Sequence, residues 1–283
     1  MLPVTPEVHA AESQAWQSAG RVAQFADYLE RMAAAPAMRV IADRSLALMT
    51  LTPGARVLEV GCGTGVFLAR LAEAVGPRGQ VTGVDHAARL AEQARQRTRS
   101  LPSVRIDVAT AYALPYPDGA FDIAHCERLL VHLDDPAAAL SEMRRVVRPG
   151  GRVVVGEPAW SSLAIDHPDA EAIDLLTRQA IVAGRQPRMG LQLNRHLAGA
   201  GLVERTIEGL TLCCRDVAEF VAYGLDLPAA ADALAAQGRL ERGRAQGVLD
   251  DLVAASAAGT FFGFLGFFLA RGERGTMTEA TTD

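Results

Sequence analysis

The sequence has 283 residues, of which 49% are apolar and 22% are charged, and its formal net charge is −5. Normal apolar content with a small net charge excludes a chain that is disordered over most of its length. The length is typical of one or two domains and is enough for a large core without disulfides. The acidic balance gives no electrostatic pattern for binding nucleic acid or an anionic membrane surface.

The cysteines and the apolar segments predict a protein of the reducing cytoplasm. The spacing of the cysteines fits neither a disulfide framework nor a metal site; they are Cys62, Cys126, Cys213 and Cys214. The longest uncharged apolar run, 257–270, is shorter than the ~20 residues of a membrane-spanning helix. The N-terminus lacks the basic and apolar blocks of a signal peptide, so we expect a cytoplasmic location without membrane contact.

The first fifty residues predict helices, and the next hundred predict strands that alternate with helices. Apolar residues recur at helical spacing up to Met49, and a turn at 52–54 follows. The expected strands are 56–60, 80–84, 104–108, 120–126 and 152–156, and the expected helices between them are 66–75, 86–100 and 136–147. Repeated units of this kind need crossovers, so the sheet should be largely parallel, with helices on both faces.

The remainder of the chain predicts more helices and two further strands. The expected helices are 170–183, 191–200, 216–224 and 240–257, and the expected strands are 203–214 and 261–270. No linker separates this part from the first, so one α/β domain spanning 1–283 is expected.

The feature that carries most chemistry is the segment VLEVGCGTG at 57–65, a hydrophobic strand that ends in a glycine turn and leads into a helix. Glycines let the backbone adopt unusual dihedrals and let a ligand lie close to it. Ligands of open α/β sheets bind at the carboxyl ends of the strands. The alternative is an ordinary tight turn between a strand and a helix.

Two kinds of ligand compete for this turn. A dinucleotide site requires G-x-G-x-x-G, but Val66 stands where that motif has its last glycine. The acidic Glu59 just before the turn suits a cationic ligand better than a pyrophosphate. Asp85 ends the next strand, and its carboxylate can accept ribose hydroxyls in either case.

The motifs VLEVGCGTG and VTGVD together resemble the class I S-adenosylmethionine-dependent methyltransferases. The block from LPYPDGAFD to RRVVRPGGRVVV resembles the small-molecule branch, close to the ubiquinone and menaquinone biosynthesis type. The resemblance covers about 20–160. It implies a doubly wound, seven-stranded, mostly parallel sheet of the Rossmann-like methyltransferase fold, with added N-terminal and C-terminal helices and an antiparallel last strand. It also implies S-adenosyl-L-methionine as the cofactor and S-adenosyl-L-homocysteine as the product.

The resemblance assigns cofactor roles residue by residue. The methionine part would lie against Glu59, Gly61, Cys62, Gly63 and Gly65. Asp85 would hold the ribose, His86 would lie beside the adenine, and Cys126 would lie beneath the sulfonium. The segment Thr110, Ala111 and Tyr112 would border the adenine, although Thr110 stands where the family commonly has an Asp. Within the single domain, 1–50 would form a helical lid, 51–160 the cofactor-binding core and 161–283 the cover of the acceptor.

Methyl transfer needs little beyond positioning, so a dedicated catalytic residue is not required unless the acceptor must lose a proton. His132 is the best candidate base, and Glu127 is a candidate for contacting the acceptor or the cofactor. Both have structural alternatives, as a packed histidine at a helix start and as an exposed acid. Tyr28, Trp160 and His167 are candidate acceptor contacts, and His125 is expected to be structural. No spacing indicates a metal site.

The function that this pattern favours is methyl transfer to an O, N or C atom of a small organic molecule, in bacterial specialised metabolism. An alternative is a cyclase or rearrangement enzyme that binds the same cofactor without transferring its methyl group. A nicotinamide-dependent oxidoreductase and a non-enzymatic binding module are further alternatives. The expected partner is a small-molecule acceptor and not nucleic acid, and the chain should be a monomer or a homodimer.

Overall fold

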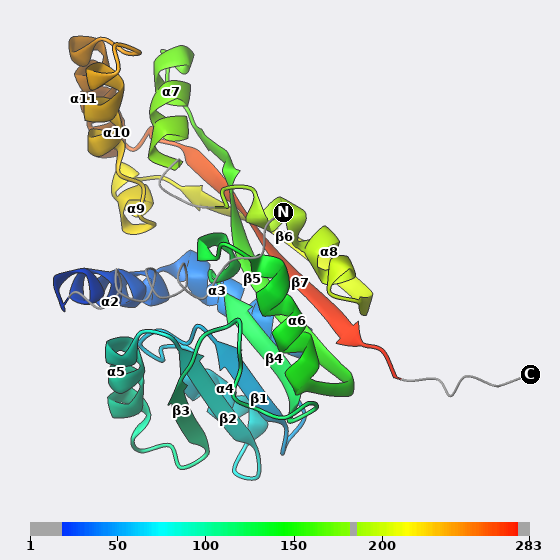
Figure 1. The fold of residues 1–283 in the computed structure, drawn as a ribbon. Helices are drawn as coiled ribbons and strands as arrows, with labels where there is room; N and C mark the ends of the chain where they lie inside the picture. The colour runs from blue at the N-terminus through cyan, green and yellow to red at the C-terminus, as the bar shows by residue number, and fades with distance from the viewer. Residues whose placement is uncertain (1–18, 182–185, 277–283) are drawn as a thin grey trace, which may run out of the picture.

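The computed structural model describes residues 19–181 and 186–276, and within them a seven-stranded sheet forms the centre of the molecule (Figure 1). The strands lie in the order β3-β2-β1-β4-β5-β7-β6. The strands of the described residues pair in parallel except for β7, which is antiparallel to β5 and β6. The strands are β1 (Arg56–Val60), β2 (Gln80–Asp85), β3 (Val104–Val108), β4 (Phe121–Glu127), β5 (Val147–Ile165), β6 (Leu202–Cys214) and β7 (Gly263–Arg274). The expected fold class, with its antiparallel last strand, is confirmed.

Helices cover both faces of the sheet and extend beyond one end of it. They are α2 (Ala19–Ala34), α3 (Pro36–Met49), α4 (Leu68–Val75), α5 (Ala88–Thr98), the short 3-10 helix η1 (Leu130–His132), α6 (Pro136–Val146), α7 (Ala170–Ile181), α8 (Met189–Gly199), α9 (Val217–Ala222), α10 (Leu227–Ala236) and α11 (Arg242–Ala258). Buried residues of α3, α4 and α5 form one apolar cluster, and those of α6 and α8 form a second. The sheet is therefore doubly wound. No described helix is long and apolar enough to cross a bilayer.

The first βα unit shows how the sequence pattern produces this arrangement. In β1 the side chains of Val57, Leu58 and Val60 are at most 1% exposed, as expected for a strand covered on both faces. In α4 the buried residues Leu68, Leu71, Ala72 and Val75 recur at helical spacing and pack toward the sheet. The turn between them lies at the carboxyl end of β1, so the packing of both elements fixes the position of the glycines.

β5 is much longer than the expected strand 152–156, because Pro158 does not end it. The Arg128 N–H donates to the Gly156 carbonyl, so Gly156 and, two residues on, Pro158 face the β4 side of β5. β4 has already ended at Glu127 there, and the missing N–H of proline removes no ladder hydrogen bond. β5 therefore continues to Ile165 along β7, with a register shift after Ala159.

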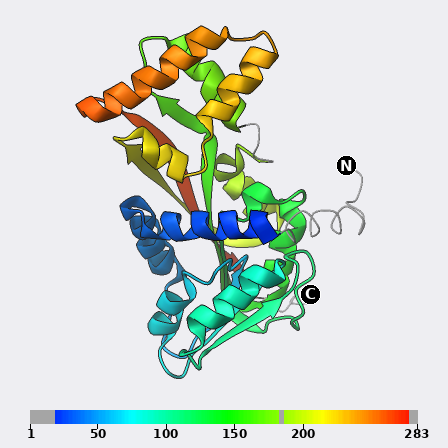
Figure 2. The same cartoon turned by 90° about the vertical axis from the view of Figure 1, so that its left-hand side faces the viewer.

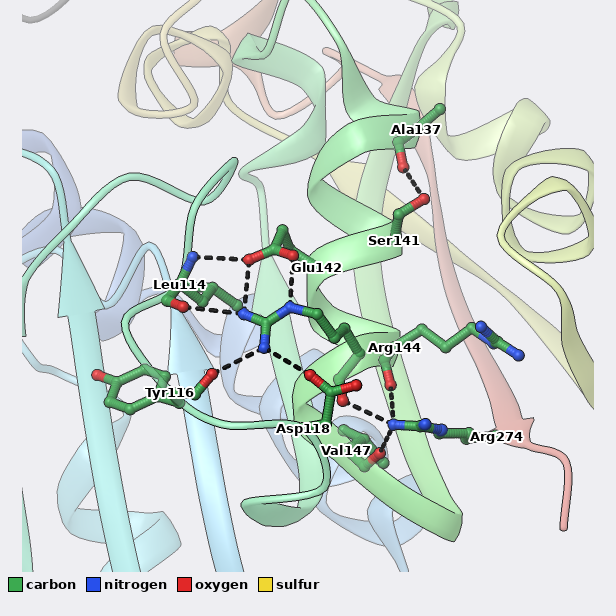
Figure 3. Close-up of polar contacts among 10 residues, drawn as sticks. Leu114, Tyr116, Asp118, Ala137, Ser141, Glu142, Arg144, Val147 and Arg274 are labelled. Atoms are coloured by element: carbon green, nitrogen blue, oxygen red, sulfur yellow. Dashed lines mark hydrogen bonds and ion pairs between the residues drawn. The ribbon is translucent and has the colours of Figure 1, made fainter. Parts of the chain in front are cut away.

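β7 is also longer at its end than the expected strand 261–270, since its charged last residues find partners. Arg152 Nε lies 3.2 Å from Glu273 Oε1. Arg274 Nη1 donates to the carbonyls of Arg145 (2.6 Å) and Val147 (2.8 Å), at the end of α6 (Figure 3). Arg145 O also accepts from Gly119 N–H at 3.1 Å, so the carbonyls at this helix end are tied both to β7 and to the loop before β4.

α10 lies where no element is predicted, and its start carries ordinary capping signals. The Asp226 side chain accepts a hydrogen bond from Ala229 N–H, and Pro228 stands in the first turn. Helices α7, α9, α10 and α11 form one group, and α2 crosses the molecule between this group and the part that holds β1 to β3 (Figure 2). Residues 1–18 of the expected lid and 182–183 of the expected helix 170–183 lie outside the described residues.

Candidate functional site

The glycine bend after β1 adopts a conformation that only glycine takes without strain. Gly61, Gly63 and Gly65 have φ values of 74°, 53° and 78°. The Gly61 N–H donates to Val84 O of β2 at 2.8 Å, which holds the bend against the neighbouring strand. A Cβ added at Gly63 would lie only 2.7 Å from Leu29 Cδ1 of α2. The bend therefore presents bare backbone at the carboxyl end of β1.

Asp85, at the end of β2, is held by backbone amides on both carboxylate oxygens. Oδ2 accepts from Gly63 N–H at 2.9 Å, and Oδ1 accepts from Ala87 N–H at 2.8 Å. The side chain is 6% exposed, and burial raises the pKa of this carboxyl above its ordinary value. His86 Nδ1 lies 3.5 Å from Oδ1. A carboxylate has about four lone-pair sites, so two remain for a ligand.

The segment after β3 is fixed in place by its own side chains. The Thr110 hydroxyl accepts from Tyr112 N–H at 3.3 Å, so it is used within the turn. The Tyr112 hydroxyl accepts from Asp134 N–H at 3.1 Å and Asp135 N–H at 3.4 Å, just before α6. Ala111 is buried between them in sequence. The segment is thereby tied to the loop that follows η1.

The next stretch of the same loop is clamped to α6 by Arg145. Its guanidinium donates to the carbonyls of Leu114 (2.9 Å) and Tyr116 (2.8 Å) and pairs with Asp118 and Glu142. Glu142 in turn accepts from Leu114 N–H at 2.8 Å. Figure 3 shows the loop residues gathered against α6. This network leaves the preceding residues 110–112 little freedom to move.

α2 lies over the glycine bend and is joined to it by polar contacts. The Thr64 hydroxyl donates to Glu30 Oε1 at 3.0 Å. Arg97 of α5 pairs with the same carboxylate, and its Nε donates to Thr64 O at 2.9 Å. With the contact between Leu29 and Gly63, these bonds make α2 a cover of the bend.

Glu59 has a buried partner that the sequence pattern does not reveal. β1 and β4 pair in a register that sets Glu59 opposite His125, and His125 Nδ1 lies 2.6 Å from Glu59 Oε2. Glu59 is 4% exposed and His125 is fully buried. Burial raises the pKa of Glu59, and the nearby carboxylate raises the pKa of His125 although burial opposes it. The pair therefore shares a proton between the ends of two strands.

Two cysteines follow the members of this pair in sequence, Cys62 after Glu59 and Cys126 directly after His125, and both are buried. Burial raises the pKa of each thiol above its ordinary value, with nearby carboxylates adding to the effect. Neither thiol is therefore suited to act as a thiolate nucleophile. No three His, Cys, Asp or Glu side chains of the described residues gather in a way that would hold a metal ion.

The Glu157 side chain of β5 fixes the backbone that follows β4. Its carboxyl accepts from the N–H groups of Leu129 (2.9 Å), Leu130 (2.6 Å) and Val131 (3.3 Å), which are the free donors at the start of η1. Burial raises the pKa of Glu157 to about 8, although these bonds act in the opposite direction. Sequence reasoning missed this role, which depends on the register that sets Glu157 of β5 just beyond the end of β4.

Around this loop lie two candidate catalytic residues and an arginine that sequence reasoning did not single out. Glu127 Oε1 lies 3.4 Å from Arg128 Nε. His132, at the end of η1, is exposed on one side. The protein packed around the imidazole and the charge of Arg128 lower its pKa to about 4. The ring is therefore neutral at pH 7 and is able to accept a proton.

The candidate acceptor residues do not all come together. The Tyr28 hydroxyl donates to Tyr223 O at 3.4 Å and interacts with the guanidinium of Arg128. Trp160 of β5 is partly buried and packs against both apolar clusters. His167 lies 3.6 Å from Asp251 of α11, and its Nδ1 accepts from Asp169 N–H at the start of α7.

Distance along the sheet separates His167 from the end of β4. Glu157 pairs with Phe268, whereas Ile165 pairs with Gly263, five residues further along β7. At ~3.4 Å per residue this separation is about 17 Å. His167 therefore belongs with the outer helices and not with the residues around Arg128.

Comparison with known proteins assigns the family. A family model described as a methyltransferase domain matches residues 58–155. An uncharacterised 37.1 kDa protein in a transposon of Streptomyces fradiae is 40% identical over 238 residues, which cover 83% of this chain and 67% of that protein. The chain belongs to the class I S-adenosylmethionine-dependent methyltransferases. S-adenosylmethionine is thus the cofactor of its family.

Further likenesses agree with membership of this methyltransferase family. A demethylmenaquinone methyltransferase of Staphylococcus epidermidis is 33% identical over 144 residues, which are 51% of this chain and 60% of that protein. The chain thus spans between about half and two thirds of the length of these curated relatives.

Solved structures with the same fold are more distant in sequence. The YcgJ protein of Bacillus subtilis has a TM-score of 0.57 at 20% identity, covering 83% of this chain and 99% of that one. The [4+2]-cyclase SpnF has a TM-score of 0.50 at 24% identity, covering 84% and 82%. At these identities the likeness concerns the fold of the methyltransferase and not its reaction.

Proposed function

We propose that this chain transfers the methyl group of S-adenosyl-L-methionine to an O, N or C atom of a small organic acceptor. The observation that supports this most strongly is the bare glycine backbone after β1, whose amide is bonded to the half-free carboxylate of Asp85. A nucleoside that carries an amino acid fits such an edge, with its ribose on the acid and its chain along the glycines.

The residues present fit the cofactor part by part. Gly61, Gly63 and Gly65 lie against the methionine part, together with Glu59 and Cys62. Asp85 accepts the ribose hydroxyls with its two remaining lone pairs. His86 and the segment 110–112 border the adenine, and Cys126 lies beneath the sulfur. The cofactor supplies a methyl group on a positively charged sulfur and leaves as S-adenosyl-L-homocysteine.

The acceptor lies at the end of β4, beside the part of β5 around Glu157 and Trp160, where the chain contributes positioning and a base. Tyr28 and Trp160 border the acceptor, and Glu127 orients it. The neutral His132 takes the proton of a hydroxyl acceptor, a step that typically contributes 10²–10⁴-fold. Orientation of the nucleophile in line with the methyl group supplies the greater part of the acceleration.

A cyclase that binds the same cofactor is the second candidate function, because the cyclase SpnF shares the fold and because no residue here is obligatory for methyl transfer. Incubation with methyl-labelled cofactor and a panel of phenols, amines and polyketides separates the two. Labelled product supports methyl transfer, and unlabelled product supports the cyclase.

We also propose a cellular location, a type of metabolism and an oligomeric state for this chain. A cytoplasmic location is supported by four free cysteines, and bacterial specialised metabolism by the arginine- and alanine-rich composition. The chain acts on a small molecule and not on nucleic acid, as a monomer or a homodimer.

Replacing Asp85 tests the cofactor assignment directly. Because both oxygens of Asp85 accept amide hydrogens, Asp85→Asn turns an NH₂ group toward a backbone donor, and Asp85→Ala removes the ribose contact altogether. Both variants should bind S-adenosyl-L-homocysteine at least about tenfold more weakly by calorimetry, since a charge-assisted hydrogen bond contributes about 1.5–3 kcal/mol.

The matched control is Asp174→Asn, which changes an exposed acid on α7 and should leave binding unchanged. Thermal unfolding of each unliganded variant shows whether the fold is kept. Unaltered affinity in a folded Asp85→Ala variant contradicts the assignment.

A further inference from the structure

Arg128 occupies an unusual position directly after β4. Its φ is 54°, in the region that favours glycine, and its N–H donates to Gly156 O at 2.8 Å. The next three amides are held by Glu157, so the backbone on both sides of this residue is fixed. A strained, non-glycine residue persists only where the surrounding structure holds it in place. Such residues cluster at active sites and ligand-binding sites.

The guanidinium is largely enclosed and only partly paired. The side chain is 16% exposed, and its Nε lies 3.4 Å from Glu127 Oε1, beyond a good hydrogen bond. Within the described parts of the chain, Nε and Nη1 are shielded from solvent and have no hydrogen-bond partner. A shielded charge with free donors is unfavourable unless an acceptor arrives to satisfy them.

The polar groups around the guanidinium do not supply an acceptor for its Nε and Nη1 within the described residues. Glu157 is occupied by three backbone amides, and the Tyr28 hydroxyl bonds to Tyr223 O as well as interacting with Arg128. His132 is neutral and close enough for the charge of Arg128 to act on it. Among the described residues, Glu127 forms an ion pair with the guanidinium, and the charge of Glu157 also acts on it.

The position of Arg128 indicates that the group it binds belongs to the methyl acceptor and not to the cofactor. Most residues assigned to the cofactor follow β1, β2 and β3, and only Cys126 of that set lies on β4. Arg128 follows β4 on the side of β5 and interacts with Tyr28 of α2, whose hydroxyl bonds to Tyr223 at the end of α9. The next residue, Leu129, packs against Gly61 of the bend.

We propose that Arg128 binds a negatively charged oxygen group of the acceptor, so that the substrate is an organic acid. The inference rests on the proposed function for the identity of the pocket. The free donors of the guanidinium hold the anion, and this contact turns the nucleophilic atom toward the methyl group and toward His132. An arginine suits this task because it stays charged and presents several donors in a fixed plane.

The test uses acetate and acetamide, a charged and a neutral probe of the same shape that are small enough to enter an acceptor pocket of any form. Protein saturated with S-adenosyl-L-homocysteine is titrated with each probe up to 100 mM, and binding is followed by ligand-observed NMR. Wild type should bind acetate roughly tenfold more tightly than acetamide. Arg128→Gln should abolish this preference, Arg128→Lys should restore part of it, and Arg178→Gln, which changes an exposed arginine of α7, should keep it.

The affinity for S-adenosyl-L-homocysteine, measured in the same samples, separates the possible failures. If wild type does not prefer acetate, or if Arg128→Gln keeps the preference, the proposal is wrong while the cofactor assignment stands. If Arg128→Gln weakens cofactor binding tenfold, the guanidinium serves the cofactor carboxylate instead, which also overturns the proposal. If the wild type does not bind S-adenosyl-L-homocysteine, the proposed function itself is refuted.

Discussion

Two histidines that follow one another along β4 and its loop show how strongly the surroundings decide the chemistry of a residue. His125 faces the Glu59 carboxylate across the strand pair, and its pKa is raised. Burial of the His132 ring and the charge of Arg128 lower its pKa to about 4. His125 therefore shares a proton with Glu59, whereas His132 is neutral and able to take a proton from an acceptor.

The pH dependence of His132 tests this assignment without knowledge of the acceptor. Because the folded protein lowers this pKa, the ring stays neutral from pH 7 downward until well below the ordinary value of about 6.5. Arg128→Gln removes the opposing charge, so the pKa should rise toward 6.5. The titration is followed by NMR of the imidazole signals, with His132→Gln to assign the signal and Arg178→Gln as the control. A wild-type pKa near 6.5 that Arg128→Gln leaves unchanged would refute the account.

At the scale of elements, α2 and β5 divide the work of building the site. β5 carries Glu157, which fixes the loop after β4, and continues past Pro158 to support the outer helices. α2 joins the two halves of the molecule, since its Glu30 contacts the glycine bend and its Tyr28 reaches the end of α9 (Figure 2). A helix with contacts to both the cofactor edge and the acceptor side is suited to act as a lid.

The lid role of α2 predicts that its polar contacts slow the release of the product. Glu30→Ala removes the bonds to Thr64 and Arg97, so the dissociation rate of S-adenosyl-L-homocysteine in stopped-flow measurements should rise. The increase should be at most about fivefold, because an exposed ion pair contributes under about 1 kcal/mol. Asp27→Ala changes an exposed acid on the same helix and serves as the control. Equal rates for all three proteins would rule out the lid role.

The seven strands and their mostly parallel sheet were predictable from the sequence, whereas the partners of the site residues were not. Short buried strands that end at an aspartate or just before a glycine, such as 80–85 and 56–60, have boundaries that the local sequence predicts. The length of β5 depends on β7, which lies about a hundred residues away in sequence, and on which edge of the strand Pro158 faces. The pairing of Glu59 with His125 depends on the register of β1 and β4.

The conformation of Arg128 has the same origin. No local pattern marks a positive φ at an arginine, since the strain is imposed by the bond of its own N–H to Gly156 O and by the bonds of the following amides to Glu157. The glycine bend is different, because the glycines in its sequence indicate positive φ values directly. The positive φ values of the bend were therefore predictable from the sequence, whereas that of Arg128 was not, and the cofactor and acceptor roles of individual residues stay predictions.

At the scale of the whole molecule, the sheet separates two tasks along its width. β1, β2 and β3 lead into most of the residues assigned to the cofactor, whereas the end of β4 and the residue after it carry the charged residues assigned to the acceptor (Figure 1). Apolar clusters on both faces hold these strand ends in register. Methyl transfer requires this side-by-side placement, because the nucleophile must meet the methyl group in line with the sulfur.

A crystal structure of the chain with S-adenosyl-L-homocysteine tests that placement most directly. We expect the ribose hydroxyls within hydrogen-bond distance of Asp85, the amino-acid part along Gly61 to Gly65, and the sulfur turned toward Arg128 and His132. A nucleoside bound away from Asp85, or a sulfur that faces away from the end of β4, would contradict the account.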